Sequence, residues 1–113
     1  MAIPELEMKR AESVLAKFCD RVPGHIRSKL AYAFTLRGNA ITLIERRPFY
    51  ADPKITTEHP FARFVFDPSS HTWSLRWRDR NGRFHGYEGF SGVRQFTALV
   101  SEVERDPTHI FFG

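Results

Sequence analysis

Residues 72–88 read TWSLRWRDRNGRFHGYE, and this stretch decides the fold because it contains the clearest strand and the clearest turn of the chain. In its first half, a tryptophan, a leucine and a second tryptophan alternate with polar residues, which is the period of a strand buried on one face. Asn81-Gly82 is the pair most typical of a tight hairpin turn. We therefore predict two antiparallel strands, 72–78 and 83–88, with the tryptophans facing the core.

Three more strands are predicted upstream of this hairpin. Residues 30–37 and 40–46 alternate on either side of a two-residue Gly-Asn turn, so we predict a second hairpin there. Residues 61–67 alternate as well and lead through a turn into the tryptophan strand. Residues 47–60 contain three prolines, and we predict a long irregular connection with at most a short strand near Ile55.

A helix is predicted near each end of the chain. In residues 4–22 a proline suits the first turn, and apolar side chains recur every three or four residues. This apolar stripe consists of Ala11, Val14, Leu15, Phe18, Cys19 and Val22. The second helix spans 92–105, with Ser91 as its N-cap and Asp106-Pro107 at its end. The apolar ending, residues 110–113, is expected to dock on the sheet or on a second copy of the chain.

Together these elements predict a single α+β domain over residues 1–113. Its mostly antiparallel sheet has about five strands, and both helices pack on one face. The only cysteine, Cys19, cannot form an internal disulfide, and no apolar run has the length of a signal-peptide core or a membrane span. We therefore expect a cytoplasmic protein of bacterial type without a membrane partner.

No motif predicts catalysis. The five histidines show no metal-binding spacing, and one cysteine is too few for a structural zinc site. The glycines of residues 86–92 match neither a Walker nor a dinucleotide-binding pattern, and no serine lies in a GxSxG motif. Glu45 with Asp67, or Glu58 with His59, could form acid–base pairs, but their spacing does not require it. We expect no catalytic residue, no metal and no cofactor.

Positive charge is the clearest functional signal. The net charge is +4, and thirteen arginines outnumber four lysines. Arginine binds phosphate and carboxylate through two parallel hydrogen bonds. Strand alternation predicts a basic, partly aromatic patch on the sheet face away from the tryptophans, made of Arg63, Arg76, Arg78, Arg83, His85 and Tyr87 and bordered by Arg46. Cations beside a stacking ring suit single-stranded nucleic acid, and an ordinary solvated sheet face is the alternative.

Three classes of function stay open at this point. The first is a non-enzymatic module that binds nucleic acid or another polyanion through the arginine-rich face. The second is a protein-interaction module, such as a homodimer formed through a sheet edge or the Phe111-Phe112 tail. The third is a small enzyme with a site near the 47–60 connection.

The sequence also resembles a small bacterial family of similar length that is catalogued only as a domain of unknown function. The features that carry the resemblance are Phe18-Cys19, Arg46-Arg47-Pro48, the PFARF stretch of residues 60–64, the WxLxW pattern of residues 73–77 running into Asp79-Arg80-Asn81, and the ending DPxxIFxG of residues 106–113. The resemblance covers nearly the whole chain. It implies a stand-alone bacterial protein without an assigned activity and supplies no catalytic residue.

Overall fold

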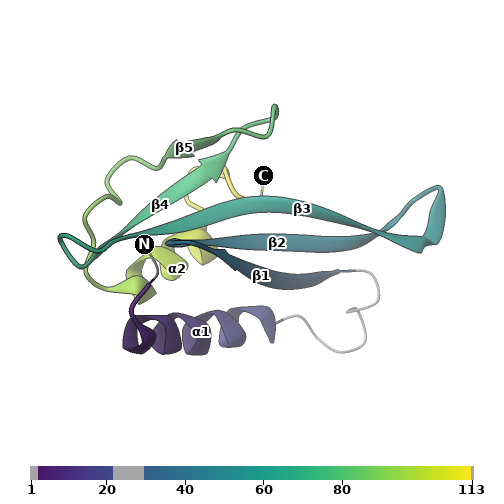
Figure 1. The fold of residues 1–113 in the computed structure, drawn as a ribbon. Helices are drawn as coiled ribbons and strands as arrows, with labels where there is room; N and C mark the ends of the chain where they lie inside the picture. The colour runs from purple at the N-terminus through teal and green to yellow at the C-terminus, as the bar shows by residue number, and fades with distance from the viewer. Residues whose placement is uncertain (1–2, 22–29, 113) are drawn as a thin grey trace.

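The computed structural model describes residues 3–21 and 30–112 of the chain (Figure 1). In chain order its elements are α1 (Glu5–Cys19), β1 (Ala31–Arg37), β2 (Ala40–Phe49), β3 (Asp52–Asp67), β4 (Thr72–Arg78), β5 (Phe84–Gly86) and α2 (Phe96–Arg105). The strands form one five-stranded sheet in the order β1-β2-β3-β4-β5, and every neighbouring pair is antiparallel. The predicted α+β class is confirmed. Val22, the last residue of the predicted apolar stripe, lies outside the described residues.

The core lies between the sheet and both helices. Ile41, Phe64 and Leu75 lie opposite one another on β2, β3 and β4, and none is more than 1% exposed. The helices complete this core with Ala11, Leu15, Phe18, Phe96, Leu99, Val100 and Val103. In Figure 1, α1 runs below the sheet and α2 lies behind it, and the two helices contact each other. Both therefore cover one face, and no helix of the described part covers the other.

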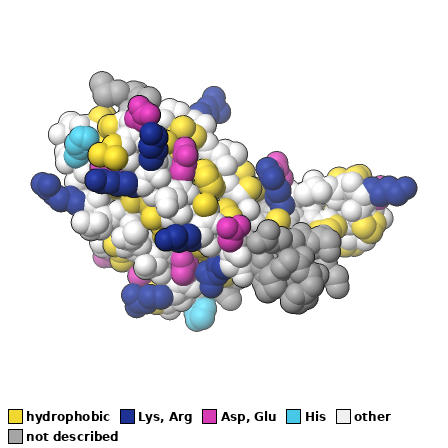
Figure 2. Space-filling model, turned by 90° about the horizontal axis from the view of Figure 1, so that it is seen from below, with side chains coloured by type: hydrophobic (Ala, Val, Ile, Leu, Met, Phe, Trp, Pro, Cys, Tyr) yellow, Lys and Arg dark blue, Asp and Glu magenta, His cyan; other side chains and the backbone are white. Residues whose placement is uncertain are grey.

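The predicted irregular connection over residues 47–60 is wrong, because this segment forms a long hairpin. β2 continues to Phe49 and β3 begins at Asp52, so the two strands pair with each other beyond the ends of β1 and β4. Residues 47–60 are called the arm here, and the arm projects from the body of the molecule (Figures 1 and 2). Alternate N–H groups of a two-stranded ribbon point to solvent, so Pro48 and Pro60 are tolerated although proline has no N–H.

The fifth strand is shorter than the predicted 83–88, because the chain leaves the ladder after three residues and runs back along β4. In this return, the N–H of Leu75 donates to the carbonyl of Phe90 at 2.8 Å. Trp73 and Val93 exchange two backbone hydrogen bonds of 2.6 and 2.9 Å. The return segment thus pairs backbone groups along the β4 edge that would otherwise be exposed.

This pairing also delays the second helix. α2 begins at Phe96 rather than at residue 92, because Val93 is still bonded to β4. Its N-cap is Gln95, which makes no side-chain capping bond, so the prediction of Ser91 as the cap is wrong.

The apolar ending, described up to residue 112, docks on its own chain, which is one of the two predicted alternatives. Asp106 ends α2 in the left-handed conformation with φ of 43°, and its carboxylate accepts hydrogen bonds from the N–H groups of Phe111 and Phe112 at 3.0 and 2.9 Å. Phe111 is 7% exposed, while the Phe112 ring packs against Tyr32 and Phe61. One buried carboxylate therefore fixes the direction of the tail.

Replacing Asp106 tests this role. We expect Asp106→Ala to lower the free energy of unfolding by about 1–3 kcal/mol, because two backbone donors lose their acceptor. Asp106→Asn should lower it less, because asparagine keeps one acceptor oxygen and tolerates the left-handed conformation. Urea denaturation followed by tryptophan fluorescence measures both changes.

The matched control is Glu104→Ala, in the helix that Asp106 ends. It removes an exposed carboxylate that lies 3.8 Å from Arg21, which follows α1. We expect it to change stability by less than about 1 kcal/mol. Equal losses in Asp106→Ala and Glu104→Ala would contradict the role of Asp106 as the anchor of the tail.

Candidate anion-binding face

Three arginines share the sheet face that no described helix covers. The register places Arg63 of β3 opposite Arg76 of β4. Arg78 is two residues further along the same face of β4, opposite Phe84 of β5. These four residues, Arg63, Arg76, Arg78 and Phe84, are called the basic face. Strand alternation predicted the shared face of the three arginines, and the strand pairing places Arg63 directly opposite Arg76.

Arg63 is held at the centre of the basic face by two contacts. Its Nε donates to Oγ1 of Thr42 at 3.0 Å, and its guanidinium lies 3.9 Å from the centroid of the Phe84 ring. Thr42 itself is only 8% exposed, so it is a fixed acceptor. A guanidinium that is already oriented loses less conformational entropy when it binds an anion.

The positive charge of the basic face is not neutralised within residues 3–21 and 30–112. Each ion pair formed there by an arginine or lysine uses a cation outside the basic face. Burial lowers the pKa of Arg63, and the nearby charges of Arg76 and Arg37 lower it further. A bound anion would relieve the repulsion of Arg63 by these two neighbouring cations.

The helix side of the molecule has a different charge pattern. Figure 2, seen from below, shows basic and acidic side chains interspersed. Lys9 lies 3.3 Å from Glu5, and Arg105 lies 3.6 Å from Glu102. Cations on this side can therefore serve as controls for those of the basic face.

Two residues predicted for the arginine face do not lie on it. His85 pairs with Trp77 and stacks on it at a centroid distance of 4.8 Å, so it is on the opposite face from Arg76. Tyr87 is buried under α2, where its hydroxyl donates to Glu102 at 2.8 Å. The reason is the turn: residues 79–83 form a five-residue loop that pairs Arg78 with Phe84 and shifts the register by one.

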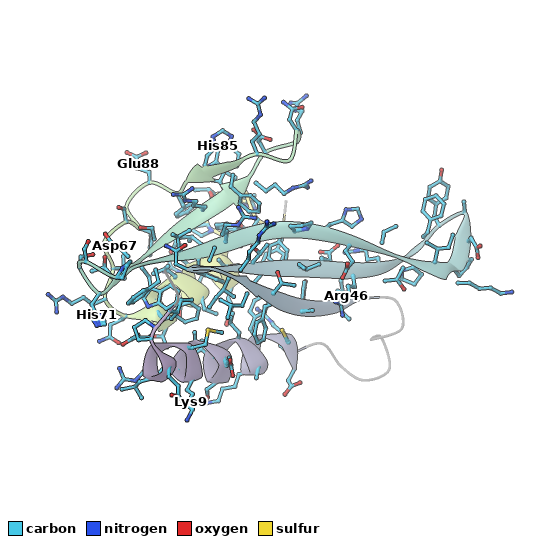
Figure 3. All side chains as sticks on the ribbon, viewed as in Figure 1. Lys9, Arg46, Asp67, His71, His85 and Glu88 are labelled. Atoms are coloured by element: carbon cyan, nitrogen blue, oxygen red, sulfur yellow. The ribbon has the colours of Figure 1, made fainter. Side chains whose placement is uncertain are left out.

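The other two predicted residues lie at the margins. Arg46 stands at the base of the arm, where its Nε is 2.6 Å from the carboxylate of Glu58 (Figure 3). Its charge is therefore largely compensated. Arg83 lies in the β4–β5 turn, exposed and before the first residue of β5.

The residues that support Arg63 do not stand out in the sequence. Alternation with Arg83 and His85 places Phe84 on the face opposite to theirs, and Thr42 alternates with Ile41 and Leu43 as many polar strand residues do. Alternation also places Arg37 on one face of the first strand, but its proximity to Arg63 depends on the order of the strands. Only a correct loop length at the Asn-Gly turn could have identified Phe84 in advance.

A second group lies at the β5 edge, around His85. Oδ2 of Asp79 accepts a hydrogen bond of 2.6 Å from Nε2 of His85, while Oδ1 accepts bonds from the backbone N–H groups of Asn81 and Arg83. An ionised carboxylate only accepts, so the proton of the His85 bond belongs to Nε2. Asp79 thus organises the turn and holds the imidazole against Trp77.

These hydrogen bonds, that of His85 first, lower the pKa of Asp79 from its ordinary 3.8 to about 2. A depressed pKa means that the ionised carboxylate stabilises the fold fully above about pH 4 and that this contribution is lost as the pH falls towards 2. We expect an NMR titration of the Asp79 side-chain carbon to give a midpoint near 2.

The variant Asp79→Asn should remove the part of the stability change that falls between pH 4 and pH 2, as measured by urea midpoints at several pH values. A titration midpoint close to 3.8 in the native protein would show that the His85 bond is not formed in solution.

Other kinds of site find little support in the described residues. No group of three or more His, Cys, Asp or Glu side chains among them is arranged to hold a metal ion. In the same part of the chain, none of the helices is long and apolar enough to cross a membrane.

Comparison with known proteins identifies the family but no activity. Residues 3–113 match the family model described as "Domain of unknown function (DUF3024)". No curated protein and no solved structure gives a significant match. The resemblance inferred from the sequence motifs is therefore confirmed at the level of the family.

Proposed function

The chain belongs to the DUF3024 family, which has no assigned function, so we propose from the geometry alone that the protein binds nucleic acid through the basic face. The observation that carries this proposal is the cluster of Arg63, Arg76 and Arg78, none of which has an ion-pair partner within the described residues. Arginines without carboxylate partners can neutralise phosphates and release their counterions, which drives binding to nucleic acid.

The aromatic ring in the cluster favours nucleic acid over a small anion. Phe84 already stacks on the guanidinium of Arg63, at 3.9 Å, and is half-buried between cations. Rings beside cations are the arrangement by which proteins bind strands without reading their sequence. The basic face lies on a sheet, and no described helix stands out from it that could enter a groove and read the hydrogen-bond donors and acceptors of the base edges. We therefore expect weak sequence preference.

Charge reversal on the basic face tests the proposal. We expect the double variant Arg76→Glu, Arg78→Glu to bind a labelled single-stranded oligonucleotide at least tenfold more weakly, by about the effect of losing two phosphate contacts. The plot of log affinity against log salt should become less steep by about 1.4, at ~0.7 per lost contact on a single strand. Fluorescence anisotropy across a salt series measures both quantities.

The control variant is Lys9→Glu, Arg105→Glu, which changes the net charge equally but on the helix side. Figure 3 shows Lys9 pointing away from the sheet. We expect it to keep most of the affinity. The proposal fails if both double variants weaken binding equally, or if the native protein does not bind at low salt.

A second candidate function is self-association through the arm. At its tip, Tyr50 is 92% exposed and Ile55 is 52% exposed, which is unusual for apolar side chains so close to unpaired strand edges. The Phe111-Phe112 tail is less suited to this role, because it is docked on its own chain.

Light scattering distinguishes this candidate. We expect a mass above that of one chain at high concentration and a monomer in the variant Tyr50→Ser, Ile55→Ser, because the exposed apolar area of the tip is removed. A monomeric native protein at every concentration rules this candidate out and leaves the basic-face proposal untouched.

A further inference from the structure

A cleft of about 450 Å³ lies beside the β5 edge, and no function discussed so far uses it. Trp77 and Ile110 contribute apolar walls, the Tyr87 ring contributes a third, and Glu88 and Thr108 add polar groups. Its size and its mixture of a flat aromatic surface with a few polar groups suit a single planar ring. His85 and Glu88 both lie along this margin of the molecule (Figure 3).

The aromatic surfaces of the cleft are held in place before any ligand binds. Trp77 is only partly exposed, and the imidazole of His85 packs against it at 4.8 Å with an interplanar angle of 33°. Asp79 fixes that imidazole through the 2.6 Å bond to Nε2. The Tyr87 hydroxyl is engaged with Glu102 at 2.8 Å, so its ring cannot turn out of the wall. His85 is not part of the cleft lining, so the imidazole and the cleft contact different parts of the indole.

The cleft and the basic face meet at one strand edge. β5 is the edge strand of the sheet and has only three residues. Trp77 and Arg78 are consecutive on β4, so their side chains point to opposite faces about one residue apart. A chain molecule that passes over this short edge can therefore contact the arginines on one side and the indole on the other.

We propose that the cleft beside Trp77 binds one unpaired base of a single-stranded nucleic acid whose phosphates lie on the basic face. The proposal rests on the proposed function and adds the strandedness of the ligand. Stacking on an indole accepts every base, while the exposed carboxylate of Glu88 offers an acceptor to the polar edge of the ring. In a duplex the bases are stacked and paired, so duplex nucleic acid would use the basic face alone.

The test compares two oligonucleotides of equal length and charge, oligothymidylate and the same backbone with abasic residues throughout. We expect the native protein to bind oligothymidylate about tenfold more tightly, because stacking on one aromatic ring adds to the shared phosphate contacts. Intrinsic fluorescence should be quenched by oligothymidylate only. The signal reports Trp77, because the chain has two tryptophans and Trp73 is 0% exposed.

Two variants of Trp77 separate stacking from folding. Trp77→Leu should lose most of the preference for oligothymidylate while it binds the abasic strand as tightly as the native protein does, and this retained binding shows that the basic face is intact. Trp77→Phe should restore most of the preference for oligothymidylate, because a smaller ring still stacks. Arg76→Glu, Arg78→Glu should weaken binding of both strands.

Equal binding of the two oligonucleotides by the native protein overturns the base-stacking proposal, while the basic-face function stands. A preference for oligothymidylate that is undiminished in Trp77→Leu also overturns it, because the base is then recognised elsewhere. If neither oligonucleotide binds at low salt, the proposed function fails and this inference fails with it.

Discussion

The antiparallel register between β3 and β4 is the constraint on which the rest of the structure depends. It places Phe64 opposite Leu75 on the helix side and, one residue away, Arg63 opposite Arg76 on the open side. Because side chains alternate with a period of two, a slip of one residue would bury the arginines and expose the core. The burial of the apolar row therefore enforces the proximity of the cations. The free energy gained by burying apolar side chains on the other face of the same strands offsets the mutual repulsion of the arginines.

The sequence predicted those parts of the fold that depend on local periodicity. Alternation along 72–78 and along 61–67 was enough to assign the strands, their buried faces and the shared face of Arg63, Arg76 and Arg78. The class of fold followed from the order of these elements and the two amphipathic helices. The face of a residue beyond a turn depends on the loop length as well. The predicted strands leave four residues, 79–82, for the turn, whereas Asp79 organises a loop of five, 79–83, so His85 and Phe84 lie on the faces opposite to those predicted.

Two other predictions were wrong: the three prolines of residues 47–60 predicted irregular structure, and the second helix was predicted to begin at residue 92. Proline argues against a strand that has neighbouring strands on both sides. Within the described residues each strand of the arm pairs with the other one only, so its prolines displace no ladder bond. After β5, a glycine-rich return pairs with β4, with Gly89 and Gly92 at positive φ. Neither local propensity nor periodicity encodes such an edge pairing, because it depends on which backbone groups the rest of the sheet leaves unsatisfied.

The arm has a consequence for how the molecule opens. Its residues add ladder bonds between two strands but almost nothing to the buried cluster, in which none of the fully buried side chains belongs to residues 47–60. Cooperative units of a protein separate where buried contacts are few. Amide protons of the arm should therefore exchange with solvent through a local fraying event, while those around Ile41 and Phe64 exchange only when the whole domain unfolds. The same long pair of strands thus belongs to two units of stability, with the boundary near the register shift between Leu43 and Ile44.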